Sequence, residues 1–102
     1  MANVKSGSIT SADNGTNIPA TNGFVVEGPF NIIIAGGTTI SATLQRLMAS
    51  GSWVTMPDSN SRSTISGAVA FNINAQPGDR YRIAVTTATG TWSWEASGEN
   101  VL

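Results

Sequence analysis

Regular alternation of side chains between two faces is the feature that most constrains this chain of 102 residues. Over Ile40–Met48 every second residue lies on the same side of an extended backbone, because successive side chains of a strand point to opposite faces. A short Ala-Ser-Gly-Ser segment then leads into a second extended run, Trp53–Met56. The pattern predicts two antiparallel strands joined by a tight turn. One face of the first strand carries Ile40, Ala42, Leu44, Arg46 and Met48.

A helix is the rival interpretation of the same stretch. Its apolar residues also recur at the spacing of an amphipathic helix, and Gly51 stands where such a helix could end. The β-branched residues of Thr38–Ile40 and Thr43 favour a strand, and no neighbouring segment has a helical pattern. We therefore expect Ile40–Met48 to form a strand.

Short alternating runs continue along the rest of the chain. Phe30–Ala35 carries apolar residues on both faces, which is typical of a central strand covered on both sides. Within Ile65–Asn74 we expect Gly67 at a bulge or a close approach of two backbones, and Pro57–Ser61 is expected to be an open loop. Seven or eight short strands at regular spacing predict an all-β fold, a single antiparallel β-sandwich of jelly-roll-like form. The other predicted strands are Phe24–Glu27, Arg80–Thr86 and Thr91–Ala96.

The two ends of the chain differ from this middle part. Residues 1–22 hold a weak edge strand followed by turn formers, Asn14 and Asn17 among them, and they have little to bury. We interpret 1–22 as a flexible N-terminal arm or edge strand that pairs with a partner. The β-sandwich domain is then expected over 23–97, and a C-terminal tail over 98–102.

Charge is scarce in this sequence, which limits the classes of function. Charged residues make up 11% of the chain and the net charge is −1, against roughly 25% charged residues in an average soluble domain. The cations are dispersed along the sequence, so we expect no nucleic-acid binding, which needs clustered Lys and Arg. A neutral polar surface suits packing against copies of the same chain or against a larger assembly. The cations are Lys5, Arg46, Arg62, Arg80 and Arg82.

Catalytic side chains are equally scarce. The sequence has no His, so it lacks the usual base for an activated Ser or Thr. It has no Cys and therefore no disulfide, and without His and Cys it lacks the commonest metal ligands. The spacing of its six carboxylates does not place two of them on one strand face as a catalytic pair. We expect no enzymatic activity, no cofactor and no metal site.

No segment indicates membrane insertion or secretion. The longest apolar run, Ile32–Ala35, is far too short to span a bilayer. Met1–Lys5 has no apolar run behind its one positive charge, as a signal peptide would. We expect a soluble protein that is synthesised in a cytoplasm and does not bind membranes.

Two aromatic residues on one predicted strand are candidates for a binding surface. Trp92 and Trp94 are two residues apart and therefore share a face. We favour the interpretation that they fill the core between the sheets. The alternatives are an interface with another subunit or a larger assembly and a platform that stacks on sugar rings. Trp53 and Tyr81 are also expected in the core.

Arg46 and Arg82 each lie among apolar neighbours on a predicted strand. In one interpretation they sit at a solvated edge, where their aliphatic stems cover apolar surface. In the other they belong to an interface and pair with Glu27 or Glu95. The candidate interface residues are Arg46, Arg82, Trp92, Trp94, Asn14 and Asn17.

Several short motifs follow one another in a distinctive order between Gly28 and Ser97. They are Gly28, Phe30 and Asn31; Leu44, Gln45 and Arg46; Trp53 and Val54; Pro77 and Gly78; Tyr81 and Arg82; and Gly90. In this order and spacing the chain resembles a group of small β-sandwich virion proteins of tailed bacteriophages. The resemblance also favours the strand over the helix for Ile40–Met48. The turn after Leu47 is shorter than is common in that group, and no functional residue carries over.

The resemblance implies a capsid-associated role. Proteins of this group are usually decoration (cement) proteins, head fibres or other accessory parts of the particle. By analogy, this chain is expected to bind the major capsid protein on the head surface of the virion and to stabilise the shell. The local threefold sites of such shells favour a homo-trimer. The alternative is another virion part, such as a head-tail or tail protein or a carbohydrate-binding module for host adhesion.

Overall fold

Alternating side chains let the chain form a strand wherever one face can be buried. The computed structural model describes residues 3–19, 23–55 and 64–101, and in this part of the chain there are ten strands. A 3-10 turn, Ser11–Asp13, follows the first of them. The strands are β1 (Asn3–Ile9), β2 (Asn17–Ile18), β3 (Phe24–Val25), β4 (Phe30–Ala35), β5 (Thr39–Leu47), β6 (Trp53–Thr55), β7 (Thr64–Ile65), β8 (Val69–Ile73), β9 (Arg80–Thr89) and β10 (Trp92–Gly98).

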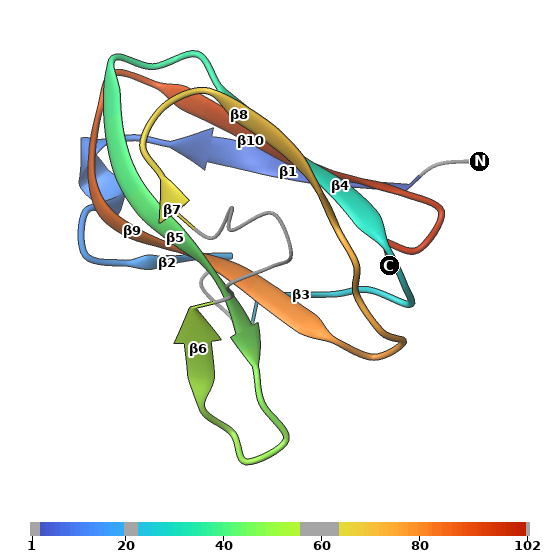
Figure 1. Ribbon diagram of the computed structural model, residues 1–102. Coiled ribbons are helices and arrows are strands. Elements are labelled where there is room, and N and C mark those ends of the chain that lie inside the picture. Colours follow the sequence, from blue (N-terminus) through green and yellow to red (C-terminus); the bar gives the residue numbers. More distant parts are fainter. Residues whose placement is uncertain (1–2, 20–22, 56–63, 102) are drawn as a thin grey trace.

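The strands form two antiparallel sheets that pack against each other (Figure 1). Sheet A has the order β1-β10-β4-β8. Sheet B has the order β2-β9-β5-β6, with β3 also paired to β9 and β7 to β5. The predicted all-β sandwich is confirmed. The strands outnumber the seven or eight expected because several of them contain only two residues.

The core lies between the sheets and is built from the inward-facing residues of both. Ile34 of β4, Leu44 of β5 and Ile83 of β9 are each 1% exposed or less. Aromatic rings from both sheets meet there with centroids 5.1 to 6.3 Å apart, and each such pair adds roughly 0.5–1.5 kcal/mol to the effect of burial. These rings belong to Phe24, Phe30, Tyr81 and Trp94.

β5 is the strand predicted from the alternation, and the structure confirms it. It pairs with β9 over Thr39–Arg46, and it also pairs with β6 and β7. The helix alternative for this stretch is wrong. A tight turn at Gly51 joins β5 to β6 as predicted, and its φ of 94° is a conformation that favours glycine.

The predicted strand over Ile65–Asn74 is in fact two strands in different sheets. Ile65 belongs to β7 in sheet B, whereas β8 lies in sheet A, so the chain changes sheets between them. Gly67 lies in this crossover with no atom within 4 Å of an ideal Cβ position, so the predicted bulge or close approach is wrong. Because Ile65 and Ile73 face the same core, alternation alone cannot distinguish one strand from two.

β4 is a central strand, but it is covered on one side only. Ile33 is 39% exposed, so the prediction of cover on both faces is wrong. The reason is that sheet A packs on sheet B with its inner face, and no described element lies on its outer face.

The N-terminal segment is built into both sheets over its described residues. β1 pairs with β10 along its whole length, and Ile9 at its end is fully buried. β2 pairs with β9 in sheet B. The described residues of 1–22 thus include the expected edge strand, β1, and they pair within both sheets of their own chain rather than forming a flexible arm.

The C-terminal residues are docked in a similar way. Val101 is buried and forms a bridge with Val26. The side-chain amide of Asn3 donates a hydrogen bond of 2.8 Å to the Val101 carbonyl. The expected open loop at Pro57–Ser61 lies outside the described residues.

Candidate interaction surface

The outer face of sheet A is made of small and mostly neutral side chains. The register across its four strands brings their outward residues onto one face. Glu95 is the one charged residue in this described set, and Val4 and Ile33 are its exposed large hydrophobic residues. We call this surface the sheet A face; it consists of Val4, Ser6, Ser8, Asn31, Ile33, Ala35, Ala70, Asn72, Ser93, Glu95 and Ser97.

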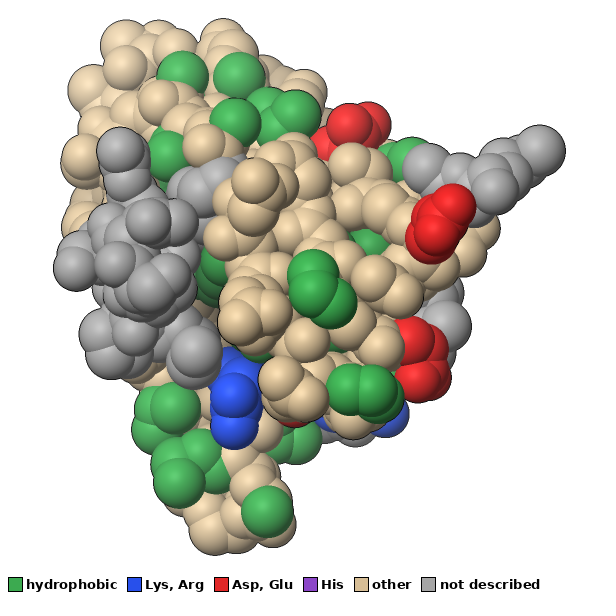
Figure 2. Space-filling view, turned by 45° about the vertical axis from the view of Figure 1, so that its right-hand side comes forward, with side chains coloured by type: hydrophobic (Ala, Val, Ile, Leu, Met, Phe, Trp, Pro, Cys, Tyr) green, Lys and Arg blue, Asp and Glu red, His purple; other side chains and the backbone are tan. Residues whose placement is uncertain are grey.

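The hairpin of β5 and β6 has a different character. It projects beyond the rest of the molecule at the lower end of Figure 1. Its tip is held by backbone hydrogen bonds from Met48 to Ser52 (2.8 Å) and from Gly51 to Met48 (2.9 Å). Met48 is 44% exposed, and Leu47, Trp53 and Val54 are only half-buried. Figure 2 shows hydrophobic side chains on this projecting part, next to Lys or Arg side chains.

Three arginines lie near the base of the hairpin although they are dispersed in the sequence. Antiparallel pairing of β5 with β9 places Arg46 opposite Tyr81, and Gln45 opposite Arg82. Arg80 begins β9 beside them. We call this region the hairpin end, defined by Arg46, Leu47, Met48, Trp53, Arg80 and Arg82. The fold thus brings three cations to one end of sheet B, with Arg46 on the face of Tyr81 and Arg82 on the opposite face, which the linear sequence does not show.

A groove of about 440 Å³ separates the hairpin from the turn that precedes β9. The turn is closed by a hydrogen bond of 3.1 Å from the Asp79 backbone N–H to the Gln76 carbonyl, with Gly78 at a φ of 87°. The groove thus combines apolar and charged walls. Its apolar walls include Leu47, Met48 and Pro77, and its charged ones Arg46, Asp79 and Arg80.

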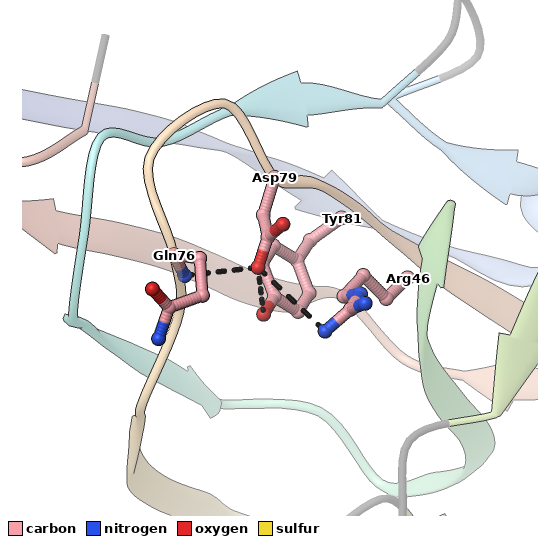
Figure 3. A network of polar contacts seen from close by, with 4 residues as sticks. All are labelled: Arg46, Gln76, Asp79 and Tyr81. Atoms are coloured by element: carbon pink, nitrogen blue, oxygen red, sulfur yellow. Dashed lines mark hydrogen bonds and ion pairs between the residues drawn. The ribbon is translucent and has the colours of Figure 1, made fainter. Parts of the chain in front are cut away.

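Asp79 is the centre of the polar contacts beside the groove (Figure 3). Its Oδ2 accepts hydrogen bonds from the Gln76 backbone N–H at 2.9 Å and from the Tyr81 hydroxyl at 3.4 Å. The same oxygen lies 3.8 Å from Nη1 of Arg46, an ion pair beyond hydrogen-bond length. Asp79 therefore attracts Arg46 electrostatically but does not form a hydrogen bond with its Nη1.

The Tyr81 side chain is fully buried and remains protonated at neutral pH. Burial, and secondarily the negative charge of Asp79, raises the pKa of its hydroxyl to about 12. The phenol is therefore a stable donor to Asp79, and it connects the aromatic core to the wall of the groove.

Arg82 and Trp53 form a second contact on the outer side of sheet B. The Arg82 guanidinium carbon lies 4.3 Å from the centroid of the Trp53 ring, in cation–π geometry. Nε of Arg82 donates a hydrogen bond of 2.8 Å to Oε1 of Gln45, and burial lowers the pKa of its guanidinium. Trp53 was expected in the core; it lies outside because it pairs with Leu47, whose side chain points away from the core.

Trp92 and Trp94 occupy the core, so the favoured prediction for them is confirmed. They are 3% and 4% exposed, which leaves no platform for sugar rings or for a surface contact. Nε1 of Trp92 donates to the carbonyls of Thr39 (2.9 Å) and Thr89 (3.1 Å). Trp94 stacks on Phe24.

The other predicted interface residues separate into two groups. Arg46 and Arg82 lie at the same end of sheet B on opposite faces, with Asp79 and Gln45 as partners rather than Glu27 or Glu95.

The asparagines lie elsewhere. Asn14 accepts a 2.8 Å hydrogen bond from the Ala88 backbone N–H, at the opposite end of β9, and Asn17 pairs with Ala84 in sheet B. Sequence reasoning missed Met48, Asp79 and Arg80, although the outward position of Leu47 in the alternation could have indicated an apolar tip.

Within the described ranges no group of three or more His, Cys, Asp or Glu side chains could hold a metal ion. The part of the chain that the structure describes also contains no helix long and apolar enough to cross a membrane. Comparison with protein-family models, curated proteins and solved structures finds no match.

Proposed function

We propose that this chain is a structural protein of a bacteriophage particle, a decoration protein that binds the outside of the head through its hairpin end. The observation that carries the proposal is the projecting hairpin, with Met48 exposed, Trp53 half-buried against Arg82, and two further arginines lining the adjacent groove. Trp, Met and Arg are the residues most enriched at protein interfaces and their hot spots. The resemblance of Gly28–Ser97 to small virion proteins gives the kind of partner.

In this role the protein acts by adding buried surface to the shell. Each copy binds the major capsid protein by its hairpin end, and copies joined around a local threefold axis hold neighbouring capsomers together. Weak individual contacts then suffice, because linked copies bind with an effective concentration that raises their total affinity. The sheet A face, with few anchoring side chains, is left towards the solvent.

The test is binding to empty heads of the bacteriophage that encodes the chain, assembled without it. We expect the protein to co-sediment with these heads and to raise their melting temperature. Met48→Ser should weaken binding at least fivefold, because it removes an exposed apolar contact of the hairpin. Ile33→Ser is the matched control, since Ile33 is 39% exposed against 44% for Met48 but lies on the sheet A face.

Two outcomes contradict the proposal. If the protein does not bind heads but binds isolated tails or head-tail connectors, it is another accessory part of the virion. If Ile33→Ser weakens head binding more than Met48→Ser, the protein uses the opposite face.

A further inference from the structure

Arg46 has hydrogen-bonding capacity that its own chain does not use. Its Nε is buried and has no hydrogen-bond partner within the described part of the chain. Its Nη1 is 3.8 Å from Asp79, a distance that allows charge attraction but no hydrogen bond. The side chain as a whole is 38% exposed and lines the groove. Arginine in this state is suited to a planar, two-pronged anion.

Asp79 cannot supply that anion. Its Oδ2 already accepts from the Gln76 backbone and from Tyr81, and these bonds hold the carboxylate in the turn. The described residues that line the groove include two arginines and this single carboxylate, so the groove itself has a net positive charge. A further negative group entering it would balance the charge.

The walls of the groove favour a carboxylate over a phosphate. The charged side chains among the described lining residues sum to +1, which one singly charged carboxylate balances and a doubly charged phosphate exceeds. The apolar walls at Leu47, Met48 and Pro77 suit the aliphatic stem of an acidic side chain and the apolar residues beside it. Both features fit a protein segment rather than a nucleotide or a nucleic-acid backbone.

We infer that the groove between the β5–β6 hairpin and the Gln76–Asp79 turn binds an Asp or Glu side chain of the partner protein, with Arg46 as its main contact. Arg80 adds positive charge at the rim, and Met48 covers the entering segment. Tyr81 and Asp79 act as positioning residues, because they hold the turn and attract the Arg46 guanidinium to one side. The inference depends on the proposed function only for the identity of the partner.

Two short peptides of the same size isolate the effect of the carboxylate. Acetyl-Gly-Leu-Glu-Leu-Gly-amide and its Gln counterpart are titrated into the full-length protein and followed by the NMR signals of the Leu47 and Gly78 amides. We expect the Glu peptide to bind about tenfold more tightly than the Gln peptide, since a charge-assisted pair is stronger than a neutral hydrogen bond. The difference should shrink as salt is added.

Variants then assign the effect to Arg46. Arg46→Gln should abolish the preference for the Glu peptide, and Arg46→Lys should retain only part of it because the ammonium lacks the planar fork. Lys5→Gln is the matched control: it makes the same change in net charge on β1 and should leave the preference intact. Circular dichroism and melting temperature show whether each variant is folded.

Equal binding of the two peptides by the wild type would overturn the inference, as would tighter binding of inorganic phosphate than of the Glu peptide. Head binding separates this inference from the proposed function. If wild type and Arg46→Gln bind heads equally while Met48→Ser does not, the carboxylate site is wrong and the decoration function stands. If the peptide preference holds but heads are not bound, the site stands and its assigned partner is wrong.

Discussion

The two solvent-facing regions of this sandwich are built from different kinds of residue. The sheet A face presents mainly Ser, Asn and Ala, with two exposed aliphatic residues and a single described carboxylate, whereas the hairpin end has three arginines, a tryptophan and an exposed methionine. Both regions belong to a chain in which only 11% of residues are charged. The low overall fraction of charged residues therefore does not show that cations are concentrated at one end of the molecule, which results from the pairing of β5 with β9.

The two regions differ in how their side chains interact with water and with a partner. On the sheet A face, most side chains are small and polar, so they form hydrogen bonds with water and provide few contacts for a partner. At the hairpin end, apolar side chains and cations project together around a groove. The exposed apolar surface is unfavourable in water, and a partner that covers it would remove this cost. The following predictions test this division.

The largest expected effect is on Trp53. Trp53→Ala removes the ring that Arg82 covers at 4.3 Å and should weaken head binding by about 30-fold or more, the loss typical of a hot-spot tryptophan. Trp53→Phe, which retains a ring, should lose less. Sedimentation with heads gives the affinities. Ile33→Ala on the sheet A face serves as control, and a larger loss from this control would reverse the assignment of the two regions.

A smaller effect is expected in the dependence of stability on pH. The Tyr81 hydroxyl has a pKa of about 12 in the folded protein and 10.0 as its ordinary value. The native state therefore keeps this proton over a pH range in which the unfolded chain loses it. The contribution of the protonated hydroxyl to stability is complete below pH 10 and is lost as pH rises towards 12. We expect the free energy of unfolding to fall by about 1–2 kcal/mol across this range.

Denaturant unfolding at several pH values measures this change. Tyr81→Phe should remove most of the alkaline loss while lowering stability by about 1 kcal/mol at neutral pH, because the hydrogen bond to Asp79 is gone. An alkaline loss of the same size in Tyr81→Phe would show that another group is responsible.

The edge of sheet A gives a third prediction. Lys5 lies opposite Ala96, so its charged side chain is on the inward side of an edge strand, a placement that prevents other strands from adding to the edge. Lys5→Val should increase self-association beyond that of the wild type, as measured by analytical ultracentrifugation at increasing concentration. Lys5→Arg keeps the charge and should behave as the wild type does. Identical masses for all three would mean that Lys5 does not protect this edge.

The smallest effect is expected at Glu95, in the middle of the sheet A face. Glu95→Gln removes an exposed charge and should change the free energy of unfolding by less than about 0.5 kcal/mol. Head binding should change by less than about twofold, equivalent to about 0.4 kcal/mol. A marked gain or loss of head binding would indicate that this face contacts the shell.

Much of the fold could be predicted from alternation alone. The inward residues Leu44, Ile83 and Trp92 could be assigned because burial of one strand face leaves a period of two in the sequence. The change of sheet between Ile65 and Val69 could not be predicted, since both strands turn apolar residues to the same core.

The candidate surface was harder to predict than the core. Arg46 and Arg82 were recognised as interface candidates, but Arg80 and Asp79 join them only through the register of β9 against β5 and the turn before β9. That register depends on contacts between residues far apart in the sequence. Trp53 was misplaced for a related reason, because pairing with Leu47 turns it outward.

Hydrogen–deuterium exchange of the protein free and bound to heads tests the central claim most directly, because it reports both regions in one measurement. We predict that binding slows exchange at the hairpin tip, residues 47–55, and at the turn, residues 76–80. Exchange of the amides at the free edges of β1 and β8, the two edge strands of sheet A, should be unchanged. Protection confined to the strands of sheet A, with the hairpin exchanging as fast as in the free protein, would contradict the account.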